Sequence, residues 1–331
     1  MTRIVTVGAA VQDVFLSNSD AFAPVCTNPD TCFNMIELGS KADVNTIFFS
    51  TGGGATNAAV TFARQGIQTQ FLGIIGQDSA GQAVLDVLDA ENVDTSLVRY
   101  SDTHNTGYSV LLVAPNGERT ILTYRGASTH YRPEDMTLEG VDADWLYVTT
   151  LAGAMPVLGR LFSEAKASGM KICFNPGKRE LEKVDELRGL LEDVDVLLAN
   201  KGEMAHIVQG SELEELVRHA LHIVPTVIVT DGANGVVASD GQKIIRAGRY
   251  EEQETVDQTG AGDAFGSGFL SQWARGKSLR ESIIFASANS ASVVRHMGAK
   301  TGILHEGVRL HDMPLHEEDV SSKKIEVHNG A

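Results

Sequence analysis

Short apolar runs alternate with amphipathic stretches from residue 143 to residue 238, and this alternation constrains the fold more than any other feature of the sequence. The apolar runs predict strands, and the stretches between them, one of which ends at Gly169, predict helices. Strands that alternate with helices form β-α-β units, which build a mostly parallel sheet covered by helices on both faces. We expect strands over 145–149, 170–175, 194–199, 226–230 and 235–238, and helices over 156–168, 180–191, 203–208 and 211–221.

The first half of the chain is less regular. It predicts strands over 4–7, 46–50 and 69–75, helices over 55–65 and 79–91, and a hairpin of 106–113 with 120–124 around Pro115-Asn116-Gly117. Residues 17–45 are rich in Ser, Asn and Asp and have few periodic apolar positions, so they form either a loop or a small β element. The charged segment 316–331 is predicted to be a tail that frays.

Charge and cysteine content exclude several classes of protein. With 27 basic and 43 acidic residues the chain has a net charge of −16, whereas binding to nucleic acid or to anionic membranes needs a basic surface. No apolar stretch is long enough to span a membrane. Three cysteines without C-x-x-C spacing argue against a disulfide framework and against structural zinc. We therefore expect Cys26 and Cys32 to stay unpaired and the protein to be cytoplasmic.

Ligands of parallel sheets bind beyond the carboxyl ends of the strands, so polar residues that follow predicted strands are candidates for a site. These are Asp13, Asn200, the segment 230–232 and the loop 257–263.

The loop reads D-Q-T-G-A-G-D-A-F and leads into a predicted helix. A glycine-rich turn before a helix points free N–H groups at one place, and the helix dipole adds positive potential, so this turn suits a phosphate. Asp263 would repel a phosphate that was merely bound. It makes sense as the base that accepts a proton from a hydroxyl attacking that phosphate, although a helix cap is the alternative explanation.

Three further candidates have a functional and a structural explanation each. Asn57, on the helix after Gly52-Gly53-Gly54, could bind sugar hydroxyls or cap that helix. Asp13 could accept hydrogen bonds from two substrate hydroxyls or belong to a turn. In Asn200-Lys201-Gly202-Glu203, Glu203 could hold a water on Mg²⁺ and Asn200 a nucleotide phosphate, or the two could cap a helix.

Taken in order, these segments resemble the ribokinase (PfkB-type) family of sugar and nucleoside kinases over roughly residues 1–305. D-Q-T-G-A-G-D-A-F is similar to the C-terminal signature of that family, and G-G-G-A-T-N-A-A, with G-I-I-G-Q-D-S-A-G at 73–81, is similar to its N-terminal signature. N-K-G-E at 200–203 resembles the family's N-x-x-E motif, and T-D-G-A-N-G at 230–235 its nucleotide loop.

The resemblance implies ATP-dependent phosphorylation of an alcohol, with Mg²⁺ and an activating K⁺. It implies Asp263 as the base, with an anion hole formed by Gly260, Ala261 and Gly262. The implied acceptor-binding positions are Asp13, Gly53, Gly54 and Asn57. The implied nucleotide positions are Asn200, Thr230, Gly232, Gly235 and, near the adenine, Ser287. Glu203 matches the Mg²⁺-associated acid, and the implied K⁺ site consists of Asp257, Thr259, Val293, His296 and Gly298.

The resemblance also implies a three-layer α/β domain with a small β-sheet lid, which closes and excludes water from the reaction. The large domain would comprise 1–13, 51–104 and 128–315, the lid 14–50 and 105–127, and the tail 316–331. Lids of some members pair, so we expect a homodimer through the lid. The chain departs from ribokinase in lacking a lysine at Gly54 or Ala55, in the length of 17–45, and in having Ser287 where many members have Asn or His.

A small sugar is the favoured acceptor. A nucleoside is the alternative, with Phe15, Phe48 and Phe49 as a wall for the base, and a sugar phosphate is the third possibility. A non-catalytic sugar or nucleotide sensor is the distant alternative, which the intact Asp263 and anion hole disfavour. A dinucleotide-binding oxidoreductase is disfavoured because G-x-G-x-x-G fails at Phe265 and at Asn57.

Overall fold

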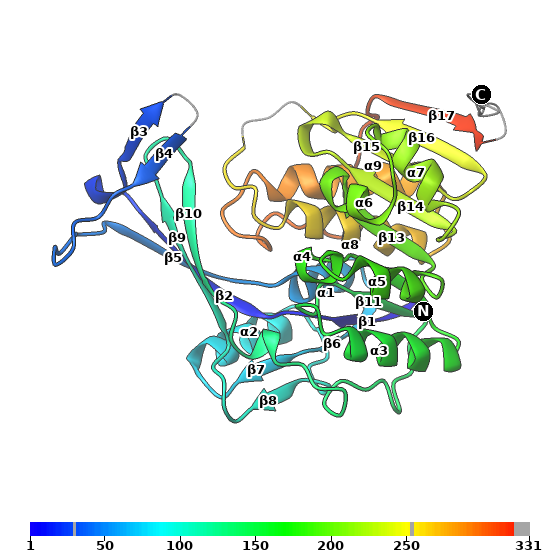
Figure 1. The fold of residues 1–331 in the computed structure, drawn as a ribbon, viewed down its shortest axis with the longest axis horizontal. Coiled ribbons are helices and arrows are strands. Elements are labelled where there is room, and N and C mark those ends of the chain that lie inside the picture. The colour runs from blue at the N-terminus through cyan, green and yellow to red at the C-terminus, as the bar shows by residue number, and fades with distance from the viewer. Residues whose placement is uncertain (29–30, 252–254, 321–331) are drawn as a thin grey trace.

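The computed structural model describes residues 1–28, 31–251 and 255–320, and a large twisted sheet forms the centre of this part of the chain (Figure 1). The strands lie in the order β17-β16-β15-β14-β13-β12-β11-β1-β6. Those from β14 to β6 are parallel, and β15, β16 and β17 join antiparallel at one edge. Their bounds are β1 Arg3–Val7, β6 Gln68–Leu72, β11 Trp145–Val148, β12 Lys171–Phe174, β13 Val196–Asn200, β14 Thr226–Thr230, β15 Val236–Ser239, β16 Lys243–Ala247 and β17 Leu315–Asp319.

Helices cover both faces of this sheet because successive strand residues point to opposite sides, as Ile4 and Val5 do in two separate hydrophobic clusters. One face packs against α3 Met155–Ala167, α4 Lys178–Leu181, α5 Val184–Leu191, α6 Lys201–Ile207 and α7 Leu213–Ala220. The other packs against α1 Gly54–Arg64, α8 Ala261–Trp273 and α9 Leu279–Val293, and α2 Ser79–Ala90 packs beside α1. The predicted three-layer α/β fold is confirmed.

A mixed sheet of β2 Val11–Ser17, β5 Thr46–Gly52, β9 Gly107–Val113 and β10 Arg119–Tyr124 forms the lid. Its order is β10-β9-β2-β5, with β2 parallel to β9 and the other pairs antiparallel. Figure 1 shows it extending from the body on the left. Strand β2 begins shortly after β1 ends, and β5 runs into α1, so two lid strands enter the large domain beside each other.

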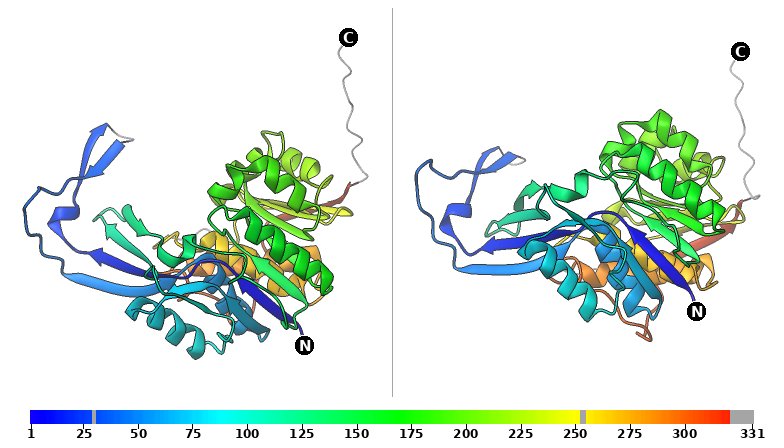
Figure 2. Two further views of the ribbon diagram at one scale, coloured as in Figure 1. Left: turned by 60° about the horizontal axis from the view of Figure 1, so that its bottom comes forward. Right: turned by 90° about the horizontal axis from the view of Figure 1, so that it is seen from below.

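Between β2 and β5, the described residues form a short 3₁₀ turn, Asp20–Phe22, and the antiparallel hairpin strands β3 Pro24–Asn28 and β4 Thr31–Asn34, which project past the lid strands (Figure 2). Cys26 and Cys32 form a disulfide, so the prediction that they stay unpaired is wrong. The hairpin register explains the difference, because it places Cys26 directly opposite Cys32 with 3.9 Å between their Cα atoms. The remaining cysteine, Cys173, is a buried free thiol.

The C-terminal segment differs from the predicted tail over its first residues. Leu315–Asp319 forms edge strand β17, whose side chains form ion pairs with β16: Lys243 pairs with Glu317, and Arg246 with Glu318. The rest of the tail prediction, from 321 to 331, lies outside the described residues. A short two-stranded parallel sheet pairs β7 Ile74–Gly76 with β8 Arg99–Ser101. Two further 3₁₀ turns lie at Gly126–Thr129 and Gly232–Asn234. Among the residues described, no helix has the length and apolar character that crossing a membrane requires.

Candidate active site

The N-terminus of α8 is built around Gly260. This residue has a left-handed backbone, with φ at +79°, and a Cβ atom here would lie 2.4 Å from the Cβ of Ala299. Glycine therefore permits both the turn and the close packing. The helix begins at Ala261, whose amide donates to the Gln258 carbonyl oxygen at 3.2 Å. The amides of Gly262 and Asp263 have no carbonyl one turn earlier in the helix, so they can donate to a ligand. Gly262 is exposed, with open space where a Cβ would be.

Asp263 lies in the first turn of α8, half-buried, and is held by one side-chain partner from α1. Asn57 Nδ2 donates to Asp263 Oδ2 at 2.8 Å. Burial raises the pKa of the Asp263 carboxyl, and the bond from Asn57 and the charge of Lys300 partly oppose this effect. On the other side, a Cβ on Gly54 would lie 3.0 Å from Asp263 Oδ1. The absence of a side chain at Gly54 thus leaves that oxygen accessible.

Gly53 lies where β5 meets α1. Its φ of +100° favours glycine, and a Cβ here would lie 2.2 Å from the carbonyl oxygen of Ala9. The close approach brings the start of α1 against the connection between β1 and β2. Asn57, one turn into α1, is thereby placed between that connection and α8.

Asp13 does not lie in a loop after the first strand. It is the third residue of lid strand β2, opposite Ser50 of β5 and Ser109 of β9. Burial raises the pKa of the Asp13 carboxyl, and the neighbouring Ser109 hydroxyl and the charge of Lys300 partly oppose this effect. A Cβ on Gly52 would lie 2.3 Å from Asp13 Oδ2, so the carboxylate faces the glycine-rich segment.

Lys300, which the sequence did not single out, is buried among these residues with 6% of its surface exposed. Its Nζ donates to the carbonyl oxygen of Thr51 at 2.8 Å, to Thr56 Oγ1 at 3.0 Å and to Asn57 Oδ1 at 2.8 Å. Burial lowers its pKa to about 7, against the attraction of Asp13 and Asp263. It lies outside both signatures, in a loop after α9 with no motif of its own, so no sequence pattern indicated it.

Two adjoining cavities lie at the carboxyl edge of the sheet. One, of about 280 Å³, is lined by the 260–263 segment together with Asn200, Glu203 and Thr230. The other, of about 440 Å³, is lined by Gly232, Gly235 and Ser287 among others, and it shares Thr230, Ala261 and Gly262 with the first. The structure thus brings the predicted nucleotide residues together around the start of α8.

Asn200 and Glu203 also cap α6. Asn200 Oδ1 accepts from the Glu203 amide at 2.9 Å, and Glu203 Oε2 accepts from the Asn200 amide at 2.9 Å. The structural explanation therefore holds, yet both side chains line the cavity beside Asp263. Burial raises the pKa of Glu203, and the charge of Asp263 contributes. The described residues contain no cluster of three or more His, Cys, Asp or Glu side chains arranged to hold a metal by themselves.

Asp257, the predicted K⁺ ligand, already has partners on both oxygens. Oδ1 accepts from the Thr259 amide at 2.9 Å and from Thr259 Oγ1 at 2.7 Å, and it forms an ion pair with Arg119 of lid strand β10. Oδ2 accepts from the Gly298 amide at 3.0 Å. Of the other predicted ligands, the Val293 carbonyl accepts from the amide of His296 at 3.0 Å, and the His296 side chain is exposed. A K⁺ ion at this carboxylate would share it with the Arg119 guanidinium.

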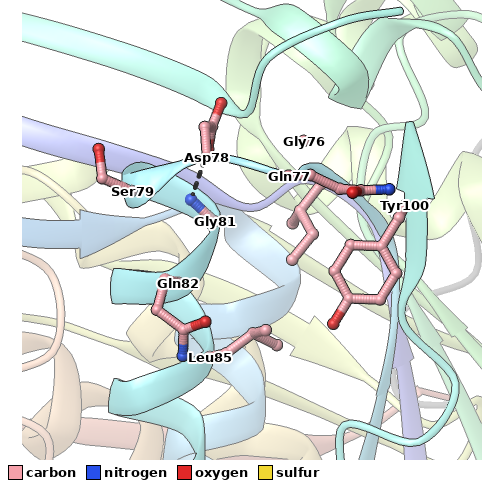
Figure 3. A pocket seen from close by; sticks show the side chains of 9 residues that line it. Gly76, Gln77, Asp78, Ser79, Gly81, Gln82, Leu85 and Tyr100 are labelled. Atoms are coloured by element: carbon pink, nitrogen blue, oxygen red, sulfur yellow. Dashed lines mark hydrogen bonds between the residues drawn. The ribbon is translucent and has the colours of Figure 1, made fainter. Parts of the chain in front are cut away.

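A third cavity, of about 660 Å³, lies between α2, β7 and β8 and shares no lining residue with the other two (Figure 3). Its only charged lining residue, Asp78, caps α2 by accepting from the Gly81 amide at 2.8 Å, and its second oxygen accepts from the Thr106 amide at 2.8 Å. The carboxylate is thus used structurally, and this cavity is not a candidate active site.

Comparisons with known proteins agree with this geometry. The family model described as "pfkB family carbohydrate kinase" matches residues 1–306. A ribokinase of Haemophilus influenzae is 29% identical over 265 residues, which cover 76% of this chain and 83% of that protein. Two solved structures share the fold. A putative ribokinase II from E. coli has a TM-score of 0.77, 20% identity and coverage of 92% of this chain and 96% of the other. A nucleoside kinase of Methanocaldococcus jannaschii has a TM-score of 0.74, 21% identity and coverage of 92% and 95%.

The family match spans nearly the whole chain and includes every predicted site residue. The resemblance inferred from the sequence signatures is therefore confirmed. The chain belongs to the PfkB family of ATP-dependent carbohydrate kinases, phosphotransferases with an alcohol group as acceptor.

Proposed function

We propose that this protein transfers the γ-phosphate of ATP to a hydroxyl of a small sugar, with Asp263 as the general base. One observation carries the proposal: the carboxylate of Asp263 lies in the first turn of α8, beside amides that can bind a phosphate, and opens onto the same cavity as Asn200 and Glu203. A base and an anion hole on one helix turn fit an attacking hydroxyl and the phosphoryl group that it receives.

The acceptor would lie between the lid and α1. Asp13 enters this region from β2 and Asn57 from α1, and Gly53 and Gly54 leave room beside them. A buried carboxylate such as Asp13 suits two neighbouring hydroxyls, each of which donates one hydrogen bond. Asp263 Oδ1, the oxygen that Asn57 does not engage, would take the proton of the reacting hydroxyl.

ATP would occupy the two adjoining cavities. Its phosphates would approach the amides of Gly260, Ala261 and Gly262, with Asn200 and Thr230 beside them. Gly232, Gly235 and Ser287 line the larger cavity, where the base and ribose fit. Mg²⁺, when bound with ATP, would neutralise charge on the phosphates, and Glu203 would hold one of its waters.

The proposal also includes a K⁺ site. Asp257 and Thr259 supply oxygen atoms near the anion hole, and backbone groups of Val293, the last residue of α9, and of His296 and Gly298 in the loop after it complete the proposed set. The ion pair from Arg119 provides one positive charge at this place without any metal. Activation by K⁺ is therefore expected to depend on Arg119.

A screen for ADP release tests the function directly. The purified protein would be incubated with Mg-ATP and K⁺ and with ribose, fructose, other sugars, sugar phosphates, adenosine, inosine or cytidine. Asp263→Asn, measured with the acceptor that is found, is expected to lower kcat by about 10²–10⁴-fold because it removes the base. ATP affinity should stay within about threefold, since the α8 amides remain. Near-normal turnover of this variant would exclude Asp263 as the base.

A nucleoside acceptor is the alternative, and it rests on aromatic residues of the lid and on the structural likeness to a nucleoside kinase. Phe49 of β5 is 55% exposed and could stack on a base. Phe15, however, is only 2% exposed and packs against Phe48 with ring centroids 5.8 Å apart, which is the geometry of lid core. The contact favours a sugar, and turnover of adenosine or inosine alone in the screen would reverse this preference. Tight ATP binding without any turnover would favour the sensor.

A homodimer through the lid is also proposed. Lid strands β5 and β10 carry large apolar side chains that are about half exposed on one face of the lid sheet: Ile47, Phe49, Leu122 and Tyr124. Both strands are edges of the lid sheet, so their outer backbone groups are available for pairing. A second copy of the chain, which offers the same surface, would cover these residues.

A further inference from the structure

Lys300 connects lid strand β5 and helix α1 through a single ammonium group. Its acceptors are the carbonyl oxygen of Thr51, at the end of lid strand β5, and the side chains of Thr56 and Asn57 on α1. An ammonium has three N–H donors, and here each has an acceptor between 2.8 and 3.0 Å. All three donors are satisfied within the protein, as burial of a charged group requires, and the three contacts fix the position of the group.

The contact with Asn57 determines which way its amide points. A carboxamide has one acceptor end and one donor end, and the protonated form of Lys300, which prevails below its pKa of about 7, can only donate. Lys300 therefore requires Oδ1 on its own side, and Nδ2 is left facing Asp263, where it donates to Oδ2 at 2.8 Å. With the amide reversed, Nδ2 would face the ammonium and Oδ1 would face a carboxylate oxygen, so both contacts would become repulsive.

We propose that Lys300 is a positioning residue for phosphoryl transfer: it orients the Asn57 amide, which in turn holds Asp263 with Oδ1 free for the acceptor hydroxyl. The proposal deepens the proposed function and rests on Asp263 being the base. Lys300 itself does not reach Asp263 by a hydrogen bond, so its effect passes through Asn57. Its positive charge also favours the ionised forms of Asp13 and Asp263.

A double-mutant cycle tests the proposal. Lys300→Met keeps much of the side-chain volume but removes all three N–H donors. Asn57→Ala removes the relay, which is the side-chain amide that links Lys300 to Asp263. We expect Lys300→Met to lower kcat about 10²-fold, because a misplaced catalytic group costs that much, with KM for ATP within about threefold of wild type. In the Asn57→Ala background the same substitution should lower kcat by less than threefold, since the relay is already absent.

Thr56→Val is the matched control. It removes another acceptor of the same ammonium, on the branch that does not lead to Asp263, and valine has nearly the shape of threonine. Its kcat should stay within about threefold of wild type even if the protein melts at a lower temperature. Equal losses of kcat in Thr56→Val and Lys300→Met would mean that Lys300 acts through general stability, and the proposal would be wrong.

Two further results of the double-mutant cycle would decide against the positioning role of Lys300. The proposal is overturned if Lys300→Met lowers kcat less than tenfold, or if its effect is undiminished in the Asn57→Ala background. If Lys300→Met does not fold, Lys300→Gln takes its place under the same criteria, because glutamine is one atom shorter and loses the Asn57 contact while staying polar.

Failure of the proposed function would be recognised separately, as a wild-type protein that turns over no acceptor in the ADP-release screen. In that case NMR measurement of how fast the Asn57 side-chain amide protons exchange with water still decides whether Lys300 orients this group. We expect slow exchange in the wild type and at least tenfold faster exchange in Lys300→Met. Similar exchange in both would overturn the orienting role itself.

Discussion

Two glycines at the start of α8 should respond in opposite ways to the same added methyl group. At Gly260 the backbone is left-handed and a Cβ would lie 2.4 Å from Ala299 Cβ. At Gly262, two residues further on, the backbone is helical and no atom lies within 4 Å of an added Cβ. The first position is closed by the protein itself, whereas the second is open toward both candidate nucleotide cavities.

Gly260→Ala should destabilise the protein. The left-handed conformation costs an alanine about 1–2 kcal/mol, and forcing a methyl into a packed contact adds about 1–3 kcal/mol. The sum is about 2–5 kcal/mol in the free energy of unfolding. With an unfolding entropy of about 2.1 cal/mol/K per residue over the chain, this corresponds to a melting temperature lower by about 3–7 °C.

Gly262→Ala should leave stability unchanged or raise the free energy of unfolding by up to about 1 kcal/mol, because alanine favours the helix more than glycine. The same methyl group would occupy space that we assign to the phosphates of ATP. We therefore expect kcat/KM for ATP to fall at least about tenfold, which corresponds to about 1.4 kcal/mol of binding or transition-state stabilisation.

Differential scanning calorimetry of the ligand-free variants and ADP-release kinetics at varied ATP measure the two effects separately. We expect Gly260→Ala to melt at a lower temperature than wild type, and Gly262→Ala to melt no earlier than wild type yet use ATP poorly. A Gly262→Ala enzyme with wild-type kcat/KM for ATP would show that the phosphates do not approach this amide. A Gly260→Ala protein as stable as wild type would refute the packing argument.

Three further predictions concern the pH profile, the cation and the lid. Because burial raises the pKa of Asp263 above its usual 3.8 and the base must be ionised, kcat should fall as the pH decreases through that raised pKa; an acid limb centred at or below 3.8 would contradict this. Replacing K⁺ by tetramethylammonium should reduce turnover, and Arg119→Met should enlarge the ratio of the two rates by freeing an Asp257 oxygen for K⁺; equal rates in both cations for both proteins would argue against a cation site. Leu122→Asp should convert a dimer into a monomer in analytical ultracentrifugation, and a wild-type protein that sediments as a monomer at micromolar concentration would exclude the dimer.

Much of the fold could be predicted because its causes are local. Apolar runs of strand length and helices that end at glycine are visible in the sequence, as in Met155–Ala167, which Gly169 follows. The start of α8 could be predicted equally well from the sequence, because residues 260–263 combine a turn glycine, a helix start and a carboxylate. The edge strand Leu315–Asp319 was missed since its charged side chains read as solvent-exposed and its pairing partner lies about 70 residues earlier, as Arg246–Glu318 shows.

The rest of the site depends on contacts between distant segments. Lys300 meets Asn57 across 243 residues, and Arg119 meets Asp257 across 138. Neither lysine nor arginine at these positions belongs to a local pattern, and an exposed charge is the ordinary expectation for both types of residue. The Cys26–Cys32 pair was missed for a related reason, because the hairpin that aligns the two thiols lies in a segment with no clear strand periodicity.

These distant contacts bring charges of opposite sign from the lid into the large domain. Asp13 enters from β2 and lies near the buried ammonium of Lys300, and Arg119 enters from β10 and pairs with Asp257. A movement of the lid that withdraws Arg119 leaves the Asp257 carboxylate, which is only 5% exposed, without its cation, and a buried unpaired charge is costly. Two effects would offset that cost: a K⁺ ion bound at Asp257, or water that enters with the opening. We therefore expect K⁺, bound at Asp257 as proposed, to favour the open lid and to speed product release. Comparing single-turnover rates with kcat would separate this effect from one on phosphoryl transfer.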